Sequence, residues 1–238
     1  MEFGCHLAPA LEWALDRKFK PQESYNPAIG EETLSDGCWT YLACGYPCRY
    51  YGRLAAHVDC IVIAIDDACR NIGYPNARAA AAVFFGMRSE FNTSFVMNTT
   101  QPTNQKAELT TGIHALRQAL VIKTRVGHSY GVDGGRLRKV VIRSDSQYLV
   151  RAMTEWIFHW ETNGYWSSNG RPVVNASLFR QLDRQIMDLN QLDVEVNFWH
   201  VPRARNEQAD RLANDALHHN WSEADEEERI RCELLPSL

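Results

Sequence analysis

The chain has 238 residues, of which 45% are hydrophobic and 23% are charged, and its formal net charge at pH 7 is −4. This length suits one domain with a substantial core and small appended segments, and it disfavours two large domains. No run of about 18 apolar residues occurs, so a membrane-spanning helix is not predicted. Glu2 stands where a secretory signal would carry positive charge, which predicts an intracellular protein, either cytoplasmic or nuclear.

Most of the net charge lies at the carboxyl end of the chain. Residues 222–238 hold 6 acids and 2 bases, so the preceding residues carry 23 of each. A neutral body neither supports nor excludes a local basic groove, and charge alone therefore leaves the partner open. The 7 cysteines are scattered and odd in number, which favours free thiols or a metal site over a disulfide framework.

Three predicted strands come first. The apolar run 61–65 is rich in β-branched residues, as expected of a strand buried on both faces. Residues 79–87 and 91–98 follow after short gaps, which predicts an antiparallel meander. The remaining elements are predicted in chain order as a helix at 104–123, a strand at 139–145, helices at 146–157 and 177–191 with a polar and aromatic segment at 159–175 between them, a strand at 194–201 and a helix at 206–217.

This order of elements predicts an α/β fold. Its sheet is mixed and five-stranded, with three antiparallel strands followed by two parallel ones, and helices flank it. Asp66 and Asp145 directly follow two of the predicted strands, so both should lie at the edge where open α/β sheets usually place their sites. Glu108 and Asp210 lie near the starts of two predicted helices, from which they could reach the same edge.

A bare cluster of these four carboxylates would be unfavourable. Two like charges about 4 Å apart repel by roughly 4 kcal/mol at an effective dielectric constant near 20. A divalent cation removes this repulsion, and hard oxygen ligands without cysteine suit Mg²⁺ or Mn²⁺ better than Zn²⁺. Two such ions about 3.5–4 Å apart can activate a water and stabilise the leaving oxygen of a phosphodiester. The pattern therefore favours a metal-dependent nuclease.

Four segments carry a resemblance to a known family. "IDDACRN", "TNQKAEL", "RSDSQYL" and "WHVPRARNEQADRLA" resemble, in the right order, the catalytic motifs of type 1 ribonuclease H, and a eukaryotic or fungal-like member in particular. The match runs over residues 59–217 and implies the ribonuclease H-like fold. It also implies a hydrolase that cuts the RNA strand of RNA/DNA hybrids endonucleolytically, leaving 5′-phosphate and 3′-hydroxyl ends.

The same resemblance assigns the catalytic residues. It implies that Asp66, Glu108, Asp145 and Asp210 hold two Mg²⁺ ions, with Mn²⁺ as an alternative. His200, ten residues before Asp210, would be the histidine that assists proton transfer and product release. A solitary histidine at the end of a strand is otherwise more often a structural residue.

The resemblance also suggests substrate contacts. Amide side chains can both donate hydrogen bonds to a 2′-hydroxyl and accept them from it, and those that match contacts to the RNA strand are Asn71, Asn104 and Gln105. Thr103 and Asn175 match a phosphate pocket for the DNA strand, although Gln101 stands where relatives can carry Arg. Trp156 and Trp160 match an aromatic channel for deoxyriboses, and burial as a helix anchor is an equal alternative for Trp156.

The first motif departs from the family at one position, because Asp67 stands where relatives have Gly. Successive residues of a strand point to opposite faces, so Asp66 and Asp67 should not both face one metal cluster. The motif gives the catalytic role to Asp66. Glycine at the next position would indicate a backbone conformation, or a close approach, that a side chain disturbs.

Three parts of the chain are predicted: residues 1–57 as an N-terminal extension packed on the core, residues 58–220 as the ribonuclease H-like catalytic domain, and residues 221–238 as an acidic tail. The extension contains Cys38, Cys44, Cys48 and His57, but their irregular spacing does not favour a zinc site. We expect a monomer that binds RNA/DNA hybrids. The alternatives are a catalytically weakened ribonuclease H-like module that binds nucleic acid or a protein, and a related acidic-motif exonuclease or integrase-like nuclease.

Overall fold

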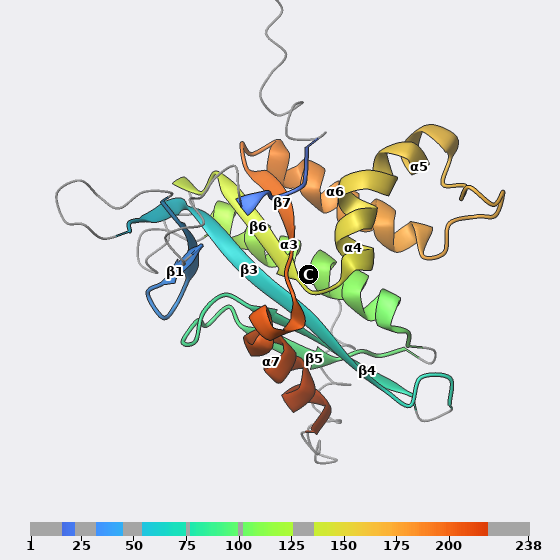
Figure 1. Cartoon of the computed structure of the whole chain (residues 1–238), viewed down its shortest axis with the longest axis horizontal. Coiled ribbons are helices and arrows are strands. Elements are labelled where there is room, and N and C mark those ends of the chain that lie inside the picture. Colours follow the sequence, from blue (N-terminus) through green and yellow to red (C-terminus); the bar gives the residue numbers. More distant parts are fainter. Residues whose placement is uncertain are drawn as a thin grey trace, which may run out of the picture.

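The computed structural model describes residues 16–21, 32–44, 54–74, 77–99, 102–125 and 136–218. The predicted α/β class with a mixed sheet is confirmed (Figure 1). All five predicted strands are present, but the described sheet has seven strands. They are β1 (Thr33–Ser35), β2 (Thr40–Ala43), β3 (Ala56–Arg70), β4 (Arg78–Phe84), β5 (Thr93–Val96), β6 (Lys139–Ser144) and β7 (Glu195–His200).

Strand β3 organises the sheet because it pairs with three other strands. It runs parallel to β6, and β6 runs parallel to β7, whereas β2 and β4 are antiparallel to β3. Ile61 pairs with both Tyr41 of β2 and Val140 of β6, so these two strands lie on opposite edges of β3. Ala64 likewise separates β4 from β6. Strands β2 and β4 therefore follow one another along the same edge.

The two additional strands correct the five-strand prediction. Strands β1 and β2 form a hairpin in the N-terminal segment, and each is too short to show a periodic pattern in the sequence. The buried hydroxyl of Thr40 donates to the carbonyl of Phe85 at 2.8 Å, which joins β2 to the end of β4. The division of the chain into extension, catalytic domain and tail stays a prediction.

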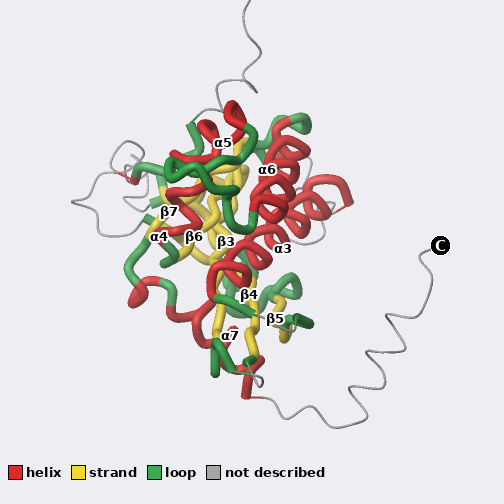
Figure 2. Tube along the Cα trace, turned by 90° about the vertical axis from the view of Figure 1, so that its right-hand side faces the viewer, coloured by secondary structure: helices red, strands yellow, loops and turns green. Residues whose placement is uncertain are grey.

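Helices cover both faces of the sheet. They are α3 (Asn104–Arg125), α4 (Gln147–Arg151), a π-helical turn η4 (Ala152–Trp156), α5 (Ile157–Asn163), α6 (Ala176–Asn190), a 3₁₀ turn η5 (Arg203–Arg205) and α7 (Glu207–His218). Figure 2 shows α3 and α6 side by side and α7 apart from them. The predicted helix 146–157 continues to Asn163 and ends at Gly164, whose φ of 75° is readily adopted only by glycine. Among the described residues, no helix has the length and apolarity needed to cross a bilayer.

Small side chains bring α7 close to the sheet. Ala68 of β3 and Ala80 and Ala82 of β4 pack with Ala213 and Leu217 of α7 in one buried cluster. The opposite face carries the main core, in which Ile63 and Ile65 of β3 join apolar residues of α3, α4 and α6. Asp66 pairs with Ala82 across the strands, so it lies on the α7 face, whereas the next residue lies on the α3 face.

Candidate active site

Two of the predicted ligands lie level with each other on neighbouring parallel strands. Ala64 of β3 pairs with Arg143 of β6, and Asp66 and Asp145 each lie two residues further along the chain. Asp145 follows β6 as predicted. Asp66 does not end its strand, because pairing with β4 continues to Arg70 opposite Arg78. What ends near Asp66 is the parallel pairing with β6, and this gives the carboxylate its place at the edge.

The other two predicted ligands come from helices. Glu108 lies near the start of α3, and Asp210 lies in the first turn of α7. Three of the four ligands and the adjacent aspartate line one hollow of about 310 Å³, whose residues include Asp66, Asp67, Asn104, Glu108, Asp145, Ser146, Arg203 and Asn214. Asp210 joins them through an ion pair with Arg203. The structure thus brings the four predicted carboxylates to one place.

Burial and mutual repulsion raise the pKa values of these acids. Burial, reinforced by the charge of Asp145, raises the pKa of Asp66 to about 7. Burial and then the charge of Glu108 raise the pKa of Asp67 to about 8. The pKa of Glu108 is raised by burial and by Asp145, although a hydrogen bond with Ser146 opposes the shift. The cluster therefore disfavours its own negative charge and favours a bound cation.

Arg203 supplies positive charge within this hollow. Its guanidinium donates to Oδ1 of Asp210 and lies 3.8 Å from Oδ2 of Asp145. The Arg203 side chain is 67% exposed, so it can change conformation without displacing buried residues. Sequence reasoning did not identify Arg203. Its position in "WHVPRARNEQADRLA", seven residues before Asp210, was the available signal.

Asn206 is a second residue that sequence reasoning missed. Its side chain is fully buried, and its Nδ2 donates to the carbonyl of Ile65 at 2.8 Å and to Oδ2 of Asp66 at 3.3 Å. It thereby links the loop before α7 to β3 and orients the carboxylate of Asp66. The signal was the asparagine at the start of "NEQAD", next to the predicted ligand Asp210.

Replacing Asn206 by Ala should lower the free energy of unfolding by about 1–3 kcal/mol, because a buried carbonyl loses its donor. Urea denaturation followed by circular dichroism measures the change. Asn214→Ala is the matched control, since the Asn214 side chain donates to the carbonyl of Asp210 in its own helix at 2.9 Å and does not reach β3. An equal decrease of the free energy of unfolding in both variants would show that the hydrogen bond to β3 adds no stability beyond that of a bond within α7.

His200 is placed differently from the carboxylates. It is the exposed last residue of β7 and pairs with Ser144, the residue before Asp145. Its side chain lines a neighbouring groove, together with Gln147, Arg151 and Arg205, and is not among the residues that line the carboxylate hollow. The described structure therefore does not bring His200 into the cluster.

The residues predicted to contact substrate surround the hollow unevenly. Asn104 lines it, and Gln105 is the exposed next residue of α3. Thr103 caps this helix, because its hydroxyl accepts from the amide of Lys106 at 3.2 Å. Asn71, with φ of 54°, follows β3. Asn175 precedes α6 and hydrogen-bonds with Tyr148. Gln101 lies outside the described residues.

Both predicted channel tryptophans are half-buried. Trp160 packs on Phe179 with ring centroids 4.9 Å apart, and Trp156 lies 5.8 Å from Trp160. The guanidinium of Arg151 lies over the Trp156 ring, 5.1 Å from the ring centroid. Partial burial of both indoles is compatible with both interpretations made for Trp156.

The chemistry of the hollow fits a hard divalent cation. Oε2 of Glu108 is buried without a hydrogen-bond partner, the pKa values of Asp66 and Asp67 are raised, and Arg203 already provides positive charge. In this conformation, however, no three described His, Cys, Asp or Glu side chains are arranged to hold one ion. Metal binding at these carboxylates would therefore need their side chains to be rearranged.

The residues of the zinc site that the sequence did not favour are described only in part. Cys38 lies near the carbonyl of Arg88, with its Sγ at 3.8 Å, and His57 lines a hollow at the other end of the sheet. Cys44 is half-buried, and Cys48 lies outside the described residues. The prediction that these residues do not form a zinc site therefore stays a prediction.

Comparison with known proteins identifies similar sequences. The family model described as RNase H matches residues 59–218. The ribonuclease H of Nitrosomonas eutropha is 30% identical over 168 residues, which cover 69% of this chain and 94% of that protein. Ribonuclease H1 of Rattus norvegicus is 29% identical over 161 residues, and this chain spans only 50% of it. The crystal structure of RNase H1 from Halobacterium salinarum covers 66% of this chain and 97% of its own, with 23% identity and a TM-score of 0.39.

Proposed function

Because the chain belongs to the ribonuclease H family, we propose that it cleaves the RNA strand of RNA/DNA hybrids endonucleolytically and leaves 5′-phosphate and 3′-hydroxyl ends. The observation that supports this proposal most is the meeting of the four motif carboxylates. Asp66, Glu108 and Asp145 line one hollow, and Asp210 is joined to it through Arg203. Four segments that lie far apart in the sequence thus contribute one acid each.

Two Mg²⁺ ions held by these four carboxylates would supply an activated water and stabilise the leaving oxygen. Mn²⁺ has the same preference for oxygen ligands. The protein's own residues prepare this site. Asn206 holds the carboxylate of Asp66, and Ser146 holds that of Glu108. Arg203 neutralises Asp210 in this structure, and its guanidinium would contact a phosphate at the rim if a cation took its place beside Asp210.

Recognition of the hybrid is proposed for the residues that match the family's substrate contacts. Asn71, Asn104 and Gln105 would hydrogen-bond the 2′-hydroxyls and bases of the RNA strand, since the 2′-hydroxyl distinguishes RNA from DNA. Thr103 and Asn175 would bind a phosphate of the DNA strand. Trp156 and Trp160 would contact its sugars.

A catalytically weakened module is the second candidate function. The observations that favour it are Asp67 in place of glycine and the ion pair between Arg203 and Asp210. Incubation with labelled RNA/DNA hybrid, double-stranded RNA and double-stranded DNA, each with Mg²⁺ or EDTA, separates the two. Cleavage of the hybrid but not of the two duplexes, in Mg²⁺ but not in EDTA, supports the proposed enzyme. Binding of hybrid without cleavage supports the module, and cleavage of duplex DNA contradicts both.

For His200 we propose the role in proton transfer and product release. Its replacement by Ala should then slow turnover of a saturating hybrid by roughly 10²- to 10⁴-fold and leave the dissociation constant of the hybrid unchanged. Steady-state kinetics at saturating hybrid and fluorescence anisotropy in EDTA measure the two quantities. Parallel losses of binding and turnover would instead assign His200 to the groove that it lines.

A further inference from the structure

Residues 16–21, which we call the edge segment, extend the sheet beyond β7. Figure 1 shows this short blue segment beside β7. Lys18 forms a parallel bridge with Phe198, whose amide donates to the carbonyl of Arg17 at 2.7 Å and whose carbonyl accepts from the amide of Phe19 at 2.9 Å. Phe198 pairs with Ile142 of β6 on its other side. The edge segment therefore covers the outer edge of β7, although it lies outside the region that the family model matches.

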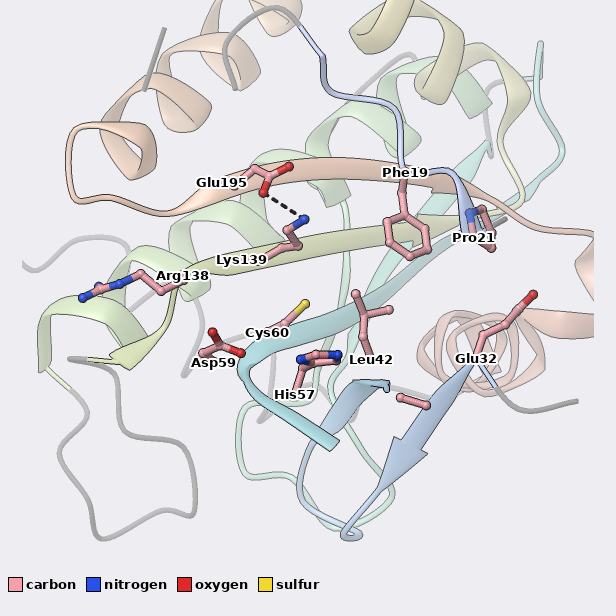
Figure 3. A pocket seen from close by; sticks show the side chains of 11 residues that line it. Phe19, Pro21, Glu32, Leu42, His57, Asp59, Cys60, Arg138, Lys139 and Glu195 are labelled. Carbon is pink, nitrogen blue, oxygen red and sulfur yellow. Dashed lines mark ion pairs between the residues drawn. The ribbon is translucent and has the colours of Figure 1, made fainter. Parts of the chain in front are cut away.

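Two buried side chains fix the edge segment in place. Arg17 is 2% exposed, and its guanidinium lies 2.7 Å from the carboxylate of Asp183 on α6. The ring of Phe19 packs on that of Trp199 with centroids 5.2 Å apart. Figure 3 shows Phe19 directed into an apolar hollow that also contains Leu42 and Cys60. The backbone of the edge segment is thus held firmly enough to position the lysines that alternate with these anchors.

Those lysines line a polar groove of about 560 Å³. The groove is lined by four cationic side chains, Lys18, Lys20, Arg151 and Arg205, and by two carboxylates, Glu32 and Glu155, which form ion pairs with Arg205 and Arg151 respectively. Lys18 is 54% exposed and 3.9 Å from Glu155, and Lys20 is 41% exposed and 3.6 Å from Asp16. Ion pairs as exposed as these are weak, so an anion of higher charge can replace them. This local excess of positive charge contrasts with the negative net charge of the chain.

The groove adjoins the carboxylate hollow. Gln147 lines the groove and lies two residues after Asp145, which lines the hollow. Arg203 of the hollow and Arg205 of the groove belong to the same 3₁₀ turn. A nucleic-acid strand with one phosphate at the carboxylates therefore has its neighbouring phosphates close to the groove, because a single 3₁₀ turn joins the two sites.

We propose that the edge segment is part of the substrate site: Lys18 and Lys20, with Arg151 and Arg205, bind backbone phosphates of the RNA strand beside the cleaved bond. The inference rests on the proposed function. A polar, positively charged groove open along its length suits a phosphodiester backbone, whose binding is dominated by charge. The segment would thus supply phosphate contacts from outside the region that the family model matches.

The test compares the full-length chain with Lys18→Glu/Lys20→Glu and with a control of equal charge change. The control, Arg117→Glu/Arg125→Glu, alters two exposed cations in the carboxyl-terminal half of α3, and neither residue is among those that line the groove, the carboxylate hollow or the hollow around Phe19. Hybrid binding is measured by anisotropy in EDTA over a range of salt concentrations, and turnover is measured with Mg²⁺. We expect the edge variant to bind on the order of tenfold more weakly, with a salt slope shallower by about 2, while turnover at saturation stays within twofold.

Shortening the hybrid on one side of the cleavage point locates the contact. The wild-type chain and the control should bind the shortened hybrid more weakly than the long one, because the phosphates that reach the groove are missing. The edge variant should bind the two hybrids with nearly equal affinity. Equal affinity and salt slope in the edge variant and the control would overturn the proposal. If hybrid is never cleaved by the wild-type chain, the proposed function fails, and the binding results still decide the role of the lysines.

The charge reversal could also detach the edge segment. The neutral variant Lys18→Gln/Lys20→Gln, together with thermal unfolding of each protein, separates these cases. Weaker binding with an unchanged melting temperature supports direct phosphate contact. Weaker binding only in variants that unfold at lower temperature assigns the lysines a structural role and contradicts the proposal.

Discussion

Replacing Asp145 by Asn should reduce cleavage of the hybrid to the uncatalysed background while the fold stays intact. Asparagine keeps the shape of the side chain and removes the charge that a divalent cation needs. Asp145 raises the pKa of both Asp66 and Glu108, so its charge reaches two of the other three proposed ligands. Loss of that charge relieves repulsion in the absence of metal, and the melting temperature without Mg²⁺ should therefore stay the same or rise.

The second measurement for this variant is independent of activity. Mg²⁺ should raise the melting temperature of the wild-type chain by binding the folded state, and Asp145→Asn should lose most of that increase. Asp193→Asn serves as the matched control, because Asp193 is exposed in the turn before β7 and asparagine tolerates its φ of 57°. Undiminished turnover in Asp145→Asn would contradict the proposed set of ligands.

The adjacent acids Asp66 and Asp67 should respond in opposite ways to substitution. Asp66→Asn should eliminate cleavage, because Asp66 lies with Asp145 and Asp210 and is held by Asn206. Asp67→Gly should preserve or raise it. Asp67 lines the same hollow but interacts most with Glu108, and Sγ of Cys69 donates to its Oδ2 at 3.3 Å; when it is ionised, its charge adds to the repulsion felt by an incoming phosphate.

The stability of Asp67→Gly follows from two opposing effects. Removing a largely buried carboxylate favours the folded state, and glycine within a strand costs about 0.5–1 kcal/mol of conformational entropy. We expect a melting temperature that is unchanged or higher. An inactive Asp67→Gly beside an active Asp66→Asn would show that the first motif is aligned one residue out of register.

The expectation of a strained backbone at Asp67 was wrong. Asp67 lies inside β3 and pairs with Ala81, and the described non-glycine residues with positive φ do not include it. The sequence showed that two acids follow an apolar run, but it could not show that β3 continues to Arg70. That extension depends on pairing with β4, a contact between residues far enough apart that local patterns do not specify it.

Other parts of the fold were predictable for definite reasons. The main helices and the central strand were identified because an apolar helical face or an apolar run marks them, as in α7 and residues 61–65. β5 has only four residues, but its segment directly follows β4 in the predicted meander, whereas β1 and β2 are equally short and lie in a segment without such a neighbouring pattern. The four carboxylates could be found from their motifs. Arg203 and Asn206 could not be distinguished from ordinary loop residues until their contacts were known.

The pairing of β2 with the amino-terminal half of β3, along the edge that also pairs with β4, bears on which residues fold together. Without β2, the amino-terminal half of β3 would expose a row of unpaired backbone groups beside apolar residues such as Ile61, and such edges recruit strands from other molecules and promote aggregation. Gly86 permits the close approach, since a Cβ there would lie 2.6 Å from the carbonyl carbon of Cys38. We therefore expect the hairpin to protect the sheet from self-association, and we expect the folding unit to start before residue 59, where the family model begins to match.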